Sequence, residues 1–528
     1  MPVFRSLWFA NIASNFGGLV QTVGAAWLMT LMTDNAAMVA LVQASTTLPV
    51  MVFSIFAGAI ADSYDRRRVM LAAQSFMFVV SVALVAITWS GHINEWSLLA
   101  ATFLIGCGLA FHIPSWQASV GDIVGKDILP AAVVLNGVGF NVTRSVAPAI
   151  GGSIVAAFGA VAAFAVNALS YIGLIGVIWR WSGAAPPTRT PEALPSAILA
   201  GVRYVGLSPN LVRVLIRSFV WGLTTVIVLA LLPLISKDLL GGGAVVFGVL
   251  LGAFGVGAVV GGLLSGKLRA RTRNETIVRC AFVSFAAASL IIAHSPWLPV
   301  TALAVALAGG GWVIALSLFN TSVQIATPRW VVGRALSLYQ MSAFGGMAVG
   351  SWVWGSLTEL ESLTYALQIA AASMLVGALL GLRLALPDPA DMNLDPLNRW
   401  QIPDVGIDLL PRSGPISIAI VYDIDAADHM EFLSLMQRRE RVRRRDGARQ
   451  WTLLRDLQRP NEWIERFELP TWAEYVRFHE RTTQEDGKVG DRLRALHRGK
   501  QRPAVRRMLI RDPSSGRTTE APGFDPNA

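Results

Sequence analysis

The chain has 528 residues, of which 53% are hydrophobic and only 15% are charged. A soluble domain of this length could not hide so much apolar surface from water, so the composition excludes an ordinary soluble protein and predicts one embedded in lipid. The formal net charge of +10 does not predict nucleic-acid binding, because the basic residues are placed as in a membrane topology.

Apolar stretches long enough to cross a bilayer core about 30 Å thick recur from Leu7 to Leu386. The first continues through Trp27 to Met32 without an obvious cleavage site, so we expect a retained helix and not a signal peptide. Twelve transmembrane helices are expected, over residues 5–32, 38–61, 68–89, 96–119, 131–156, 161–181, 213–236, 245–267, 275–294, 298–322, 334–357 and 363–385.

Lys and Arg gather in alternate loops, on the side of the membrane that holds the N-terminus. These loops and the adjoining ends of the predicted spans carry Arg66, Arg67, Arg68, Lys267, Arg269, Arg271, Arg273, Arg279, Arg329 and Arg334. The opposite loops carry Asp34, Glu95, Asp238, Glu359 and Glu361, with Lys237 as their only Lys or Arg. This positive-inside asymmetry predicts that both termini are cytoplasmic.

Polar side chains inside the apolar stretches form a candidate solute cavity, since lipid-facing positions would be apolar. Because we find no carboxylate near the middle of any predicted span, Arg144 favours an anionic or strongly hydrogen-bonding solute. The alternative is that Arg144 bonds backbone carbonyls or Asn and Thr side chains. Trp116, Trp221 and Trp312 could stack on a ring-bearing solute. The cavity residues are Asn15, Gln43, His112, Gln117, Asn136, Asn141, Arg144, Asn320, Tyr339 and Gln340.

A proline-rich stretch from Ser182 to Asn210 divides the predicted helices six and six. Sliding the first half over the second by 203 positions aligns Gly58 with Gly261, Arg66 with Arg269, and Gly152 with Gly355. Two parallel six-helix repeats are typical of transporters whose solute site lies near the membrane midplane and which work by rocking one half against the other.

After Leu386 the composition becomes polar, and a soluble segment follows. Strands over 416–424, 450–457, 463–469 and 505–510 alternate with helices over 426–445, 472–483 and 489–497, which predicts a ferredoxin-like α+β domain. The expected organisation is an N-terminal six-helix half (1–181), a cytoplasmic linker (182–210), a C-terminal six-helix half (211–388), a connector (389–414), the ferredoxin-like domain (415–511) and a disordered tail (512–528).

The stretch from Gly58 to Arg68, Gly-Ala-Ile-Ala-Asp-Ser-Tyr-Asp-Arg-Arg-Arg, resembles the loop motif of the major facilitator superfamily, although Ser63 and Asp65 depart from it. Its form is similar to the exporter branch that includes the enterobactin exporter and macrolide efflux proteins, of the transmembrane secretion effector type. The resemblance covers about residues 1–388 and implies a protein of the bacterial plasma (inner) membrane.

The resemblance also implies a cytoplasmic latch whose contacts exist in only one of two rocking states. Gly58 lets two helices approach closely, and Asp62 can accept from Arg66 or lie against a helix N-terminus. The alternative is that the arginines only set the topology. The latch residues are Gly58, Asp62, Arg66, Arg67, Arg68 and Asp122.

The fifth predicted helix carries Pro148, Gly151 and Gly152, similar to the Gly-Pro-x-x-Gly-Gly element of superfamily exporters, with Ala147 in place of the first Gly. Proline removes a backbone hydrogen bond and the glycines permit close packing, so this helix-five motif predicts a bendable helix between the halves. Ordinary tight packing is the alternative.

By family analogy, export uses the proton gradient, which requires a group that titrates near neutral pH. His112 is the candidate, and a purely structural histidine is the alternative. No GxxxxGK[ST] loop is present, so direct ATP drive is not expected. Cys107 and Cys280 lack metal-ligand spacing and are expected to be packing residues.

The C-terminal segment resembles, by pattern, small dimeric domains of the antibiotic biosynthesis monooxygenase type. His429, Trp451, Trp463, Tyr475 and His479 are available for a site, but no metal or nucleophile spacing is present, so we expect dimerisation or regulation. The arginine-rich helix could bind anionic lipid at the inner leaflet or be a solvated face; its arginines are Arg438, Arg439, Arg441, Arg443, Arg444 and Arg445.

These features together predict a transporter that exports a small organic solute, such as a siderophore, drug or metabolite, by alternating access and proton antiport. We expect no enzyme activity, no cofactor, no metal and no nucleic-acid partner. The alternatives are an importer or facilitator of the same fold, a membrane-anchored monooxygenase-like enzyme, and a sensor with a transporter-like membrane region.

Overall fold

The structure is a computed structural model. It describes residues 2–124, 129–181, 194–328, 330–387, 393–395, 397, 399–400, 402–499 and 502–511. The chain separates into two compact units. The first contains residues 1–194, 213–323 and 336–388, and the second contains residues 195–212, 324–335 and 389–528. The tail expected over 512–528 to be disordered lies outside the described residues.

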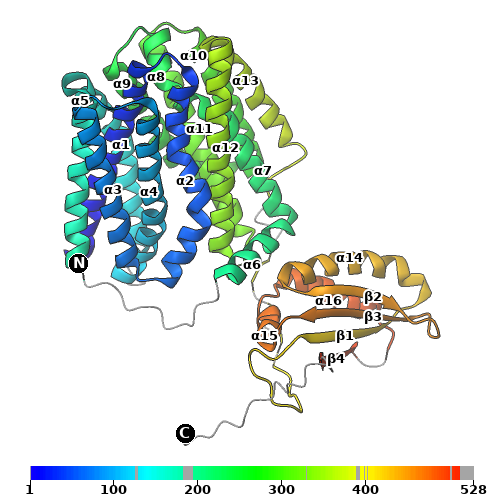
Figure 1. Cartoon of the computed structure of the whole chain (residues 1–528). Helices are drawn as coiled ribbons and strands as arrows, with labels where there is room; N and C mark the ends of the chain where they lie inside the picture. The colour runs from blue at the N-terminus through cyan, green and yellow to red at the C-terminus, as the bar shows by residue number, and fades with distance from the viewer. Residues whose placement is uncertain are drawn as a thin grey trace, which may run out of the picture. The chain divides into compact units, whose positions relative to one another are not determined.

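The first unit is a bundle of long helices, each of which coincides with one or two of the predicted spans (Figure 1). Among the described residues, nine segments are long and apolar enough to cross a membrane. The elements are α1 (Pro2–Met32), α2 (Ala36–Ser63), α3 (Arg66–Trp89), α4 (Glu95–Val124), α5 (Leu129–Arg180), α7 (Pro209–Ala230), α8 (Leu232–Leu234), the π-helical turn η1 (Ile235–Leu239), α9 (Ala244–Arg271), α10 (Asn274–His294), α11 (Leu298–Ile325), α12 (Val332–Leu360) and α13 (Leu363–Leu380).

Helix α5 contains two predicted spans, 131–156 and 161–181, in one continuous element. The break between them is at Gly159, whose φ of 77° lies in the left-handed region. An L-residue with a side chain would be strained there, so glycine is the residue that lets the chain leave one span and enter the next.

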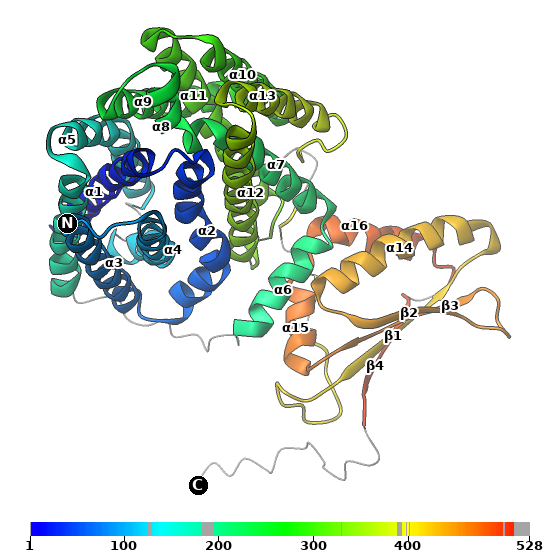
Figure 2. The ribbon, with the colours of Figure 1, turned by 45° about the horizontal axis from the view of Figure 1, so that its top comes forward.

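Seen from another direction, the early helices α1 to α4 form one group and the helices α9, α10, α11 and α13 form another (Figure 2). Two helix pairs join the groups: α5 lies beside α9, and α2 lies beside α12. At Gly355 on α12, a Cβ atom would lie 2.8 Å from the Cα of Ala37 on α2. Small residues thus bring these helices into backbone contact.

The second unit contains a helix in the range where the sequence predicted only a linker. This helix, α6 (Leu194–Gly206), buries Ala200, Tyr204 and Val205, while Leu199 is exposed. Buried residues spaced four and five apart define one face of an amphipathic helix. The prolines from Pro186 to Pro195 and the low hydropathy of the stretch predicted a linker, and the short helix that begins at the last of these prolines was missed.

The rest of the second unit is the predicted βαββαβ domain. Its sheet has the order β2-β3-β1-β4, with every neighbouring pair antiparallel, as in a ferredoxin-like fold. Alternate residues of β1 face the helices, which gives a core that includes Ile418, Phe432, Phe467 and Phe478. The elements are β1 (Ile416–Asp423), η3 (Ala426–Asp428), α14 (His429–Asp446), β2 (Arg449–Arg455), β3 (Glu462–Leu469), α15 (Trp472–Glu480), α16 (Gln484–Leu496) and β4 (Ala504–Leu509).

Candidate functional site

The first latch residue, Gly58, lies at the contact between α2 and α12. A Cβ atom on Gly58 would be 3.3 Å from the Ser337 Oγ atom. One turn earlier, the Ser54 hydroxyl donates to the Ser337 carbonyl oxygen at 3.2 Å. The latch therefore begins where a helix of the early group touches a helix of the late group.

The latch arginines bind the ends of neighbouring helices. Arg66 donates to the Ala118 carbonyl on α4 at 3.2 Å, and Arg67 donates to the Ile178 carbonyl on α5 at 3.1 Å. Arg68 is exposed and lies 3.5 Å from Asp65. The side chains of Asp62 and Asp122 lie outside the described residues, so their predicted contacts with Arg66 stay predictions.

The position that repeats Arg66 makes a matching contact. Arg269 on α9 donates to the hydroxyls of Thr321 at 3.1 Å and Ser317 at 2.7 Å, both on α11. Arg66 and Arg269 are separated by 203 positions, and so are their partners Ala118 and Thr321. Both arginines thus contact positions separated by the same offset, although Arg66 bonds a backbone carbonyl and Arg269 bonds side-chain hydroxyls.

The helix-five motif lies against α9. A Cβ atom on Gly152 would be 2.6 Å from the Ala244 carbonyl oxygen, and one on Gly248 would be 2.7 Å from the Pro148 carbonyl oxygen. Gly151 faces the other way, toward Val20 on α1. These separations leave no room for a side chain, so α5 and α9 are in backbone contact along this stretch.

The predicted cavity residues bond neighbouring helices in pairs. His112 Nε2 lies 3.1 Å from Asn11 Oδ1, and Trp116 donates to Asn136 at 3.3 Å. His112 is only 4% exposed. Polar contacts of this kind hold α4 to α1 and to α5, so these residues have a structural role in the bundle as well as any role in binding.

The other predicted cavity residues are more scattered. Tyr339 donates to the Leu316 carbonyl at 3.1 Å, and the Arg144 guanidinium lies 5.7 Å from the centre of the Phe254 ring. Gln117 is exposed, and the side chain of Asn141 lies outside the described residues. The partly buried ones are Asn15, Gln43, Asn320 and Gln340.

The suggestion that Trp221 and Trp312 stack on a solute is wrong for both residues. Its ring is 0% exposed and contacts Phe282 and Phe285 edge to face, with centroids 4.7 and 5.7 Å away. Trp312 is 3% exposed and belongs to the same ring cluster. Both rings are packing residues because neighbouring aromatic side chains cover their faces and edges.

Two buried polar clusters were missed by the sequence interpretation. Asn167 on α5 donates to Gln21 on α1 and to the Tyr171 hydroxyl, and Ser81 on α3 also donates to Gln21. This cluster ties three helices together. A polar residue inside an apolar run is the signal that could have identified Asn167, as it identified Arg144.

The second missed cluster is an ion pair between α7 and α10. Arg217 is fully buried and lies 3.1 Å from Glu275, and it also donates to the Gly377 carbonyl on α13. Glu275 in turn accepts from the Leu386 backbone N–H at 3.0 Å. Arg217 lies near the start of its predicted span, 213–236, and was not identified as a candidate from the sequence.

Charged residues at the predicted outer end join the early and late groups of helices. Lys237 donates to the Thr30 carbonyl at 3.1 Å and lies 3.6 Å from Asp34. Glu359 on α12 accepts from the backbone N–H of Ala36, the first residue of α2, at 2.8 Å. A carboxylate at a helix N-terminus is stabilising, so this contact favours closure of that end.

The candidate enzyme residues of the soluble domain do not gather at one place. His429 contacts Trp463 edge to face, whereas His479 stacks on Trp400 from the connector at 4.6 Å. Trp451 donates to buried Glu465 at 3.2 Å. Burial, with help from nearby arginines, lowers the pKa of His479 to about 3, so this ring stays neutral at physiological pH.

The lipid-binding interpretation of the arginine-rich helix is wrong for half of its arginines. Arg439 and Arg443 bind Glu465 inside the domain at 2.9 and 3.0 Å, and Arg445 binds Asp446 at 2.8 Å. These guanidinium groups point into the protein because buried carboxylates lie there. The exposed arginines are Arg438, Arg441 and Arg444.

Comparisons with known proteins assign the whole chain to one family. The family described as transmembrane secretion effector matches residues 1–514. The multidrug efflux pump Tap of Mycobacterium tuberculosis (strain ATCC 25618 / H37Rv) is 25% identical over 411 residues, which cover 75% of this chain and 95% of the pump. The enterobactin exporter EntS of Shigella flexneri is 26% identical over 67% of this chain and 85% of its own length.

A staphyloferrin A transporter of Staphylococcus aureus is 26% identical over 48% of this chain and 64% of its own length. Among solved structures, the POT family transporter PepTSo has a TM-score of 0.61 at 12% identity, covering 73% of this chain and 97% of that one. A bacterial homologue of the lysosomal transporter Spinster has a TM-score of 0.54 at 14% identity, covering 72% and 95%. The chain belongs to the transmembrane secretion effector family of the major facilitator superfamily.

Proposed function

We propose that this transporter exports a small organic solute by alternating access between two six-helix repeats. Twelve membrane spans follow if α1, α12 and both parts of α5 cross the membrane together with the other apolar segments. The observation that carries the proposal is the pair of close-packed interfaces, α5 with α9 and α2 with α12, each joining helices from opposite sides of the linker. Contacts lined by glycine have no interlocking side chains, so they allow two halves to rock against each other.

The matched contacts of Arg66 and Arg269 support the repeat. Arg66, the first residue of α3, reaches Ala118 on α4, and Arg269, near the end of α9, reaches Thr321 on α11. The two contacted positions are separated by the same 203 residues as the two arginines. Two halves built alike can exchange inward-open and outward-open arrangements of similar energy, which alternating access requires.

The two ends of the bundle differ in the contacts between halves. At the predicted outer end, the charged residues Lys237 and Glu359 bind residues of the other half. At the predicted inner end, the arginines Arg66 and Arg67 bind carbonyls within the first half, and the described bond between α2 and α12 is the uncharged one from Ser54 to Ser337. This pattern supports a state that is closed outside. In an exporter, that is the state that receives solute from the cytoplasm.

Siderophores and drug-like metabolites are the proposed solutes, because relatives of this chain carry the names of an enterobactin exporter and a multidrug efflux pump. Arg144 on α5 is the proposed contact for an anionic group, since a guanidinium group binds a carboxylate through two parallel hydrogen bonds. Arg144→Gln is expected to lower export of an anionic siderophore about tenfold with little change for a neutral drug. Arg383→Gln, at an exposed site after α13, is the control.

His112 is the proposed proton-coupling group. Its Nε2 atom bonds Asn11 on α1, so a change in its protonation would alter a contact between helices α4 and α1. His112→Gln is expected to abolish stimulation of export by an imposed pH gradient while solute exchange persists. The control is His92→Gln, in an exposed turn, and an unchanged response in His112→Gln would contradict the assignment.

The protein is proposed to lie in the bacterial inner membrane with both termini cytoplasmic and to form dimers through the soluble domain. The face of the sheet turned away from its helices carries an apolar row, Leu454, Ile464, Val421 and Ala504. Leu454 is 47% exposed. Replacement of Leu454 by Glu is expected to convert a dimer to a monomer in size-exclusion chromatography with light scattering.

Export is tested by comparing the small molecules in culture medium and cell extract between a host that lacks the protein and one that expresses it. A compound that leaves the cell only with the intact protein, and not with the latch variant Asp62→Asn, would establish export and name the solute. Accumulation of a supplied solute inside the expressing cells would instead favour an importer of the same fold.

A further inference from the structure

The unit that contains the soluble domain also contains two segments that connect membrane helices. Residues 195–212 include α6 and lead directly into α7, and residues 324–335 join α11 to α12. All three of these membrane helices belong to the second predicted half. The soluble domain and these two connections of the second predicted half therefore belong to one compact unit.

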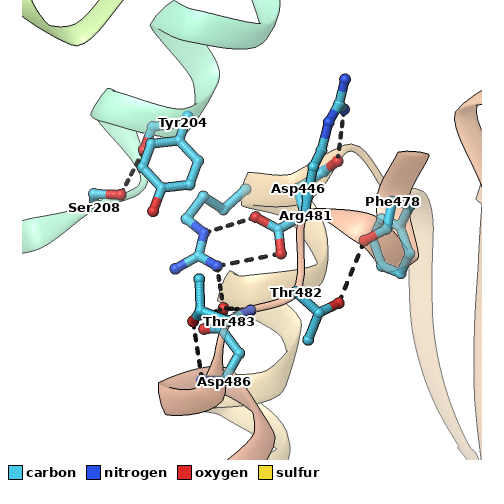
Figure 3. A network of polar contacts seen from close by, with 9 residues as sticks. Tyr204, Ser208, Asp446, Phe478, Arg481, Thr482, Thr483 and Asp486 are labelled. Carbon is cyan, nitrogen blue, oxygen red and sulfur yellow. Dashed lines mark hydrogen bonds and ion pairs between the residues drawn. The ribbon is translucent and has the colours of Figure 1, made fainter. Parts of the chain in front are cut away.

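Two aromatic rings and two guanidinium groups stack where these segments meet the soluble domain. Tyr204 on α6 and Trp330 contact each other edge to face, with centroids 5.4 Å apart. Arg445 lies 4.8 Å from the centre of the Tyr204 ring, and Arg481 lies 4.3 Å from that of Trp330. Figure 3 shows Tyr204 and Ser208 on one side and Asp446, Arg481 and Asp486 of the soluble domain on the other. Cations over aromatic faces attract, most strongly where water is excluded, and Tyr204 is only 2% exposed.

Carboxylates of the soluble domain hold both guanidinium groups in place. Arg445 donates to Asp446 at 2.8 Å and to Asp486 at 2.7 Å, and Arg481 donates to Glu474 at 3.3 Å. These bonds lie at the edges of the guanidinium planes, which leaves the planar faces to stack on the rings. The docking surface is thus pre-arranged within the soluble domain.

Glycines let side chains of one part approach the backbone of another. A Cβ atom on Gly201 of α6 would lie 2.7 Å from the Arg334 Cβ atom at the start of α12. One on Gly447, at the end of α14, would lie 3.1 Å from an Arg203 nitrogen on α6. The stack and these contacts form one continuous interface, built by α6, the connection from α11 to α12, and the soluble domain.

We propose that this face of the soluble domain is a docking surface for the connections of the second half, and that it makes the cytoplasmic ends of α7, α11 and α12 move as one body. The proposal rests on the alternating-access function given above. A domain bound to both connections removes their freedom to move apart, and rocking of a half as a rigid body requires that its helix ends stay together.

Hydrogen exchange of the full-length chain in lipid nanodiscs tests the docking. Trp330→Ala removes one ring from outside the ferredoxin-like fold, and Arg481→Lys keeps the charge beside Glu474 but loses the planar face. Each is expected to speed exchange of α6 amides roughly tenfold while the core of β1 and β3 stays protected. Arg438→Ala, on the exposed face of α14, is the matched control.

Transport by the same variants tests the consequence. Turnover is expected to fall roughly threefold in Trp330→Ala and Arg481→Lys with KM unchanged, because movement of the half is affected and solute binding is not. Unchanged exchange of α6 in both variants would overturn the docking surface. Faster exchange with unchanged turnover would overturn its role in movement. If the wild-type chain moves no solute, the proposed function fails, while the exchange data still decide the docking.

Discussion

The network around Glu465 in the soluble domain and the contacts proposed to change during transport in the helical bundle hold their polar groups in opposite ways. In the soluble domain, the fully buried carboxylate of Glu465 accepts from four side chains: Tyr422, Arg439, Arg443 and Trp451. In the bundle, His112 reaches Asn11 through one ring nitrogen, and Lys237 reaches Thr30 at a partly exposed helix end. A saturated network specifies one arrangement, whereas single contacts between helices can be broken and remade. The difference suits a rigid domain attached to a moving transporter.

Glu465→Gln is expected to have the largest effect on stability. It leaves Arg439 and Arg443 buried without a compensating charge, which costs about 3–5 kcal/mol. Hydrogen exchange of α14 and β3 in the full-length chain measures this loss, and Glu480→Gln, at an exposed position on α15, is the control. Equal amide protection in the two variants would show that the hydrogen bonds of Glu465 do not stabilise the domain.

The pH dependence of the same domain sharpens the comparison. Burial alone would raise the pKa of Glu465, but Arg439 and Arg443 hold it at about 2, below its ordinary 4.5. Its stabilising contribution is therefore complete above pH 4.5 and lost as the pH falls from 4.5 toward 2. Burial, opposed by Arg445, raises the pKa of Asp446 from 3.8 to about 6, so the folded state gains stability as the pH falls through that range.

Because the pKa of His479 is lowered from 6.5 to about 3, the folded state loses stability as the pH falls below 6.5, and this loss offsets the gain from Asp446. The free energy of unfolding should thus be greatest above pH 6.5 and fall most steeply below pH 4.5. Amide exchange of α14, followed from pH 7 to pH 3, checks this course after correction for the intrinsic exchange rate. In Glu465→Gln the fall below pH 4.5 should be much smaller, and an unchanged fall would contradict the assignment to Glu465.

In the bundle, the interface of α5 and α9 should be sensitive to a single methyl group. Gly152→Ala places a Cβ atom 2.6 Å from the Ala244 carbonyl, and overpacking of this kind costs about 1–3 kcal/mol. Transport should fall about tenfold or more while the protein remains in the membrane. Gly173 is also on α5, but a Cβ atom there would have no neighbouring atom within 4 Å, so Gly173→Ala should transport normally. Equal transport by both variants would show that the interface of α5 and α9 has no role in transport.

The contact of Glu359 with the Ala36 N–H should have a smaller effect. Glu359→Gln weakens a charge at a helix N-terminus by about 0.5–1 kcal/mol, which opens the outer end severalfold more often. In a chain with Cys107 and Cys280 replaced by Ala, labelling of a cysteine at buried Thr30 by an impermeant thiol reagent measures this opening. Glu361→Gln, on the adjacent exposed turn, should leave labelling unchanged.

The fold could be predicted in considerable detail because its signals are local. Apolar runs marked the helices to within a few residues, and the order of strands and helices after Pro415 gave the ferredoxin-like topology. Helix α6 was missed because its apolar face is short and follows a run of prolines. The break at Gly159 was expected between two spans, but the continuous helical path around it was not.

The candidate site was less predictable because it depends on which helices become neighbours. The sequence selected His112 and Arg144 as unusual residues, but not the partners Asn11 and Phe254, which come from other helices. For the same reason, the six arginines of α14 could not be divided between exposed and buried positions. Glu465, which holds two of them, is more than twenty positions away on β3.

Uptake into everted inner-membrane vesicles tests the central claim most directly. In everted vesicles the cytoplasmic face is outside, so solute added to the medium reaches that face. With an imposed proton gradient, vesicles with the wild-type chain should accumulate an anionic siderophore or drug, and vesicles with Gly152→Ala should not. Accumulation only in right-side-out vesicles, or equal accumulation with and without the protein, would contradict export by alternating access.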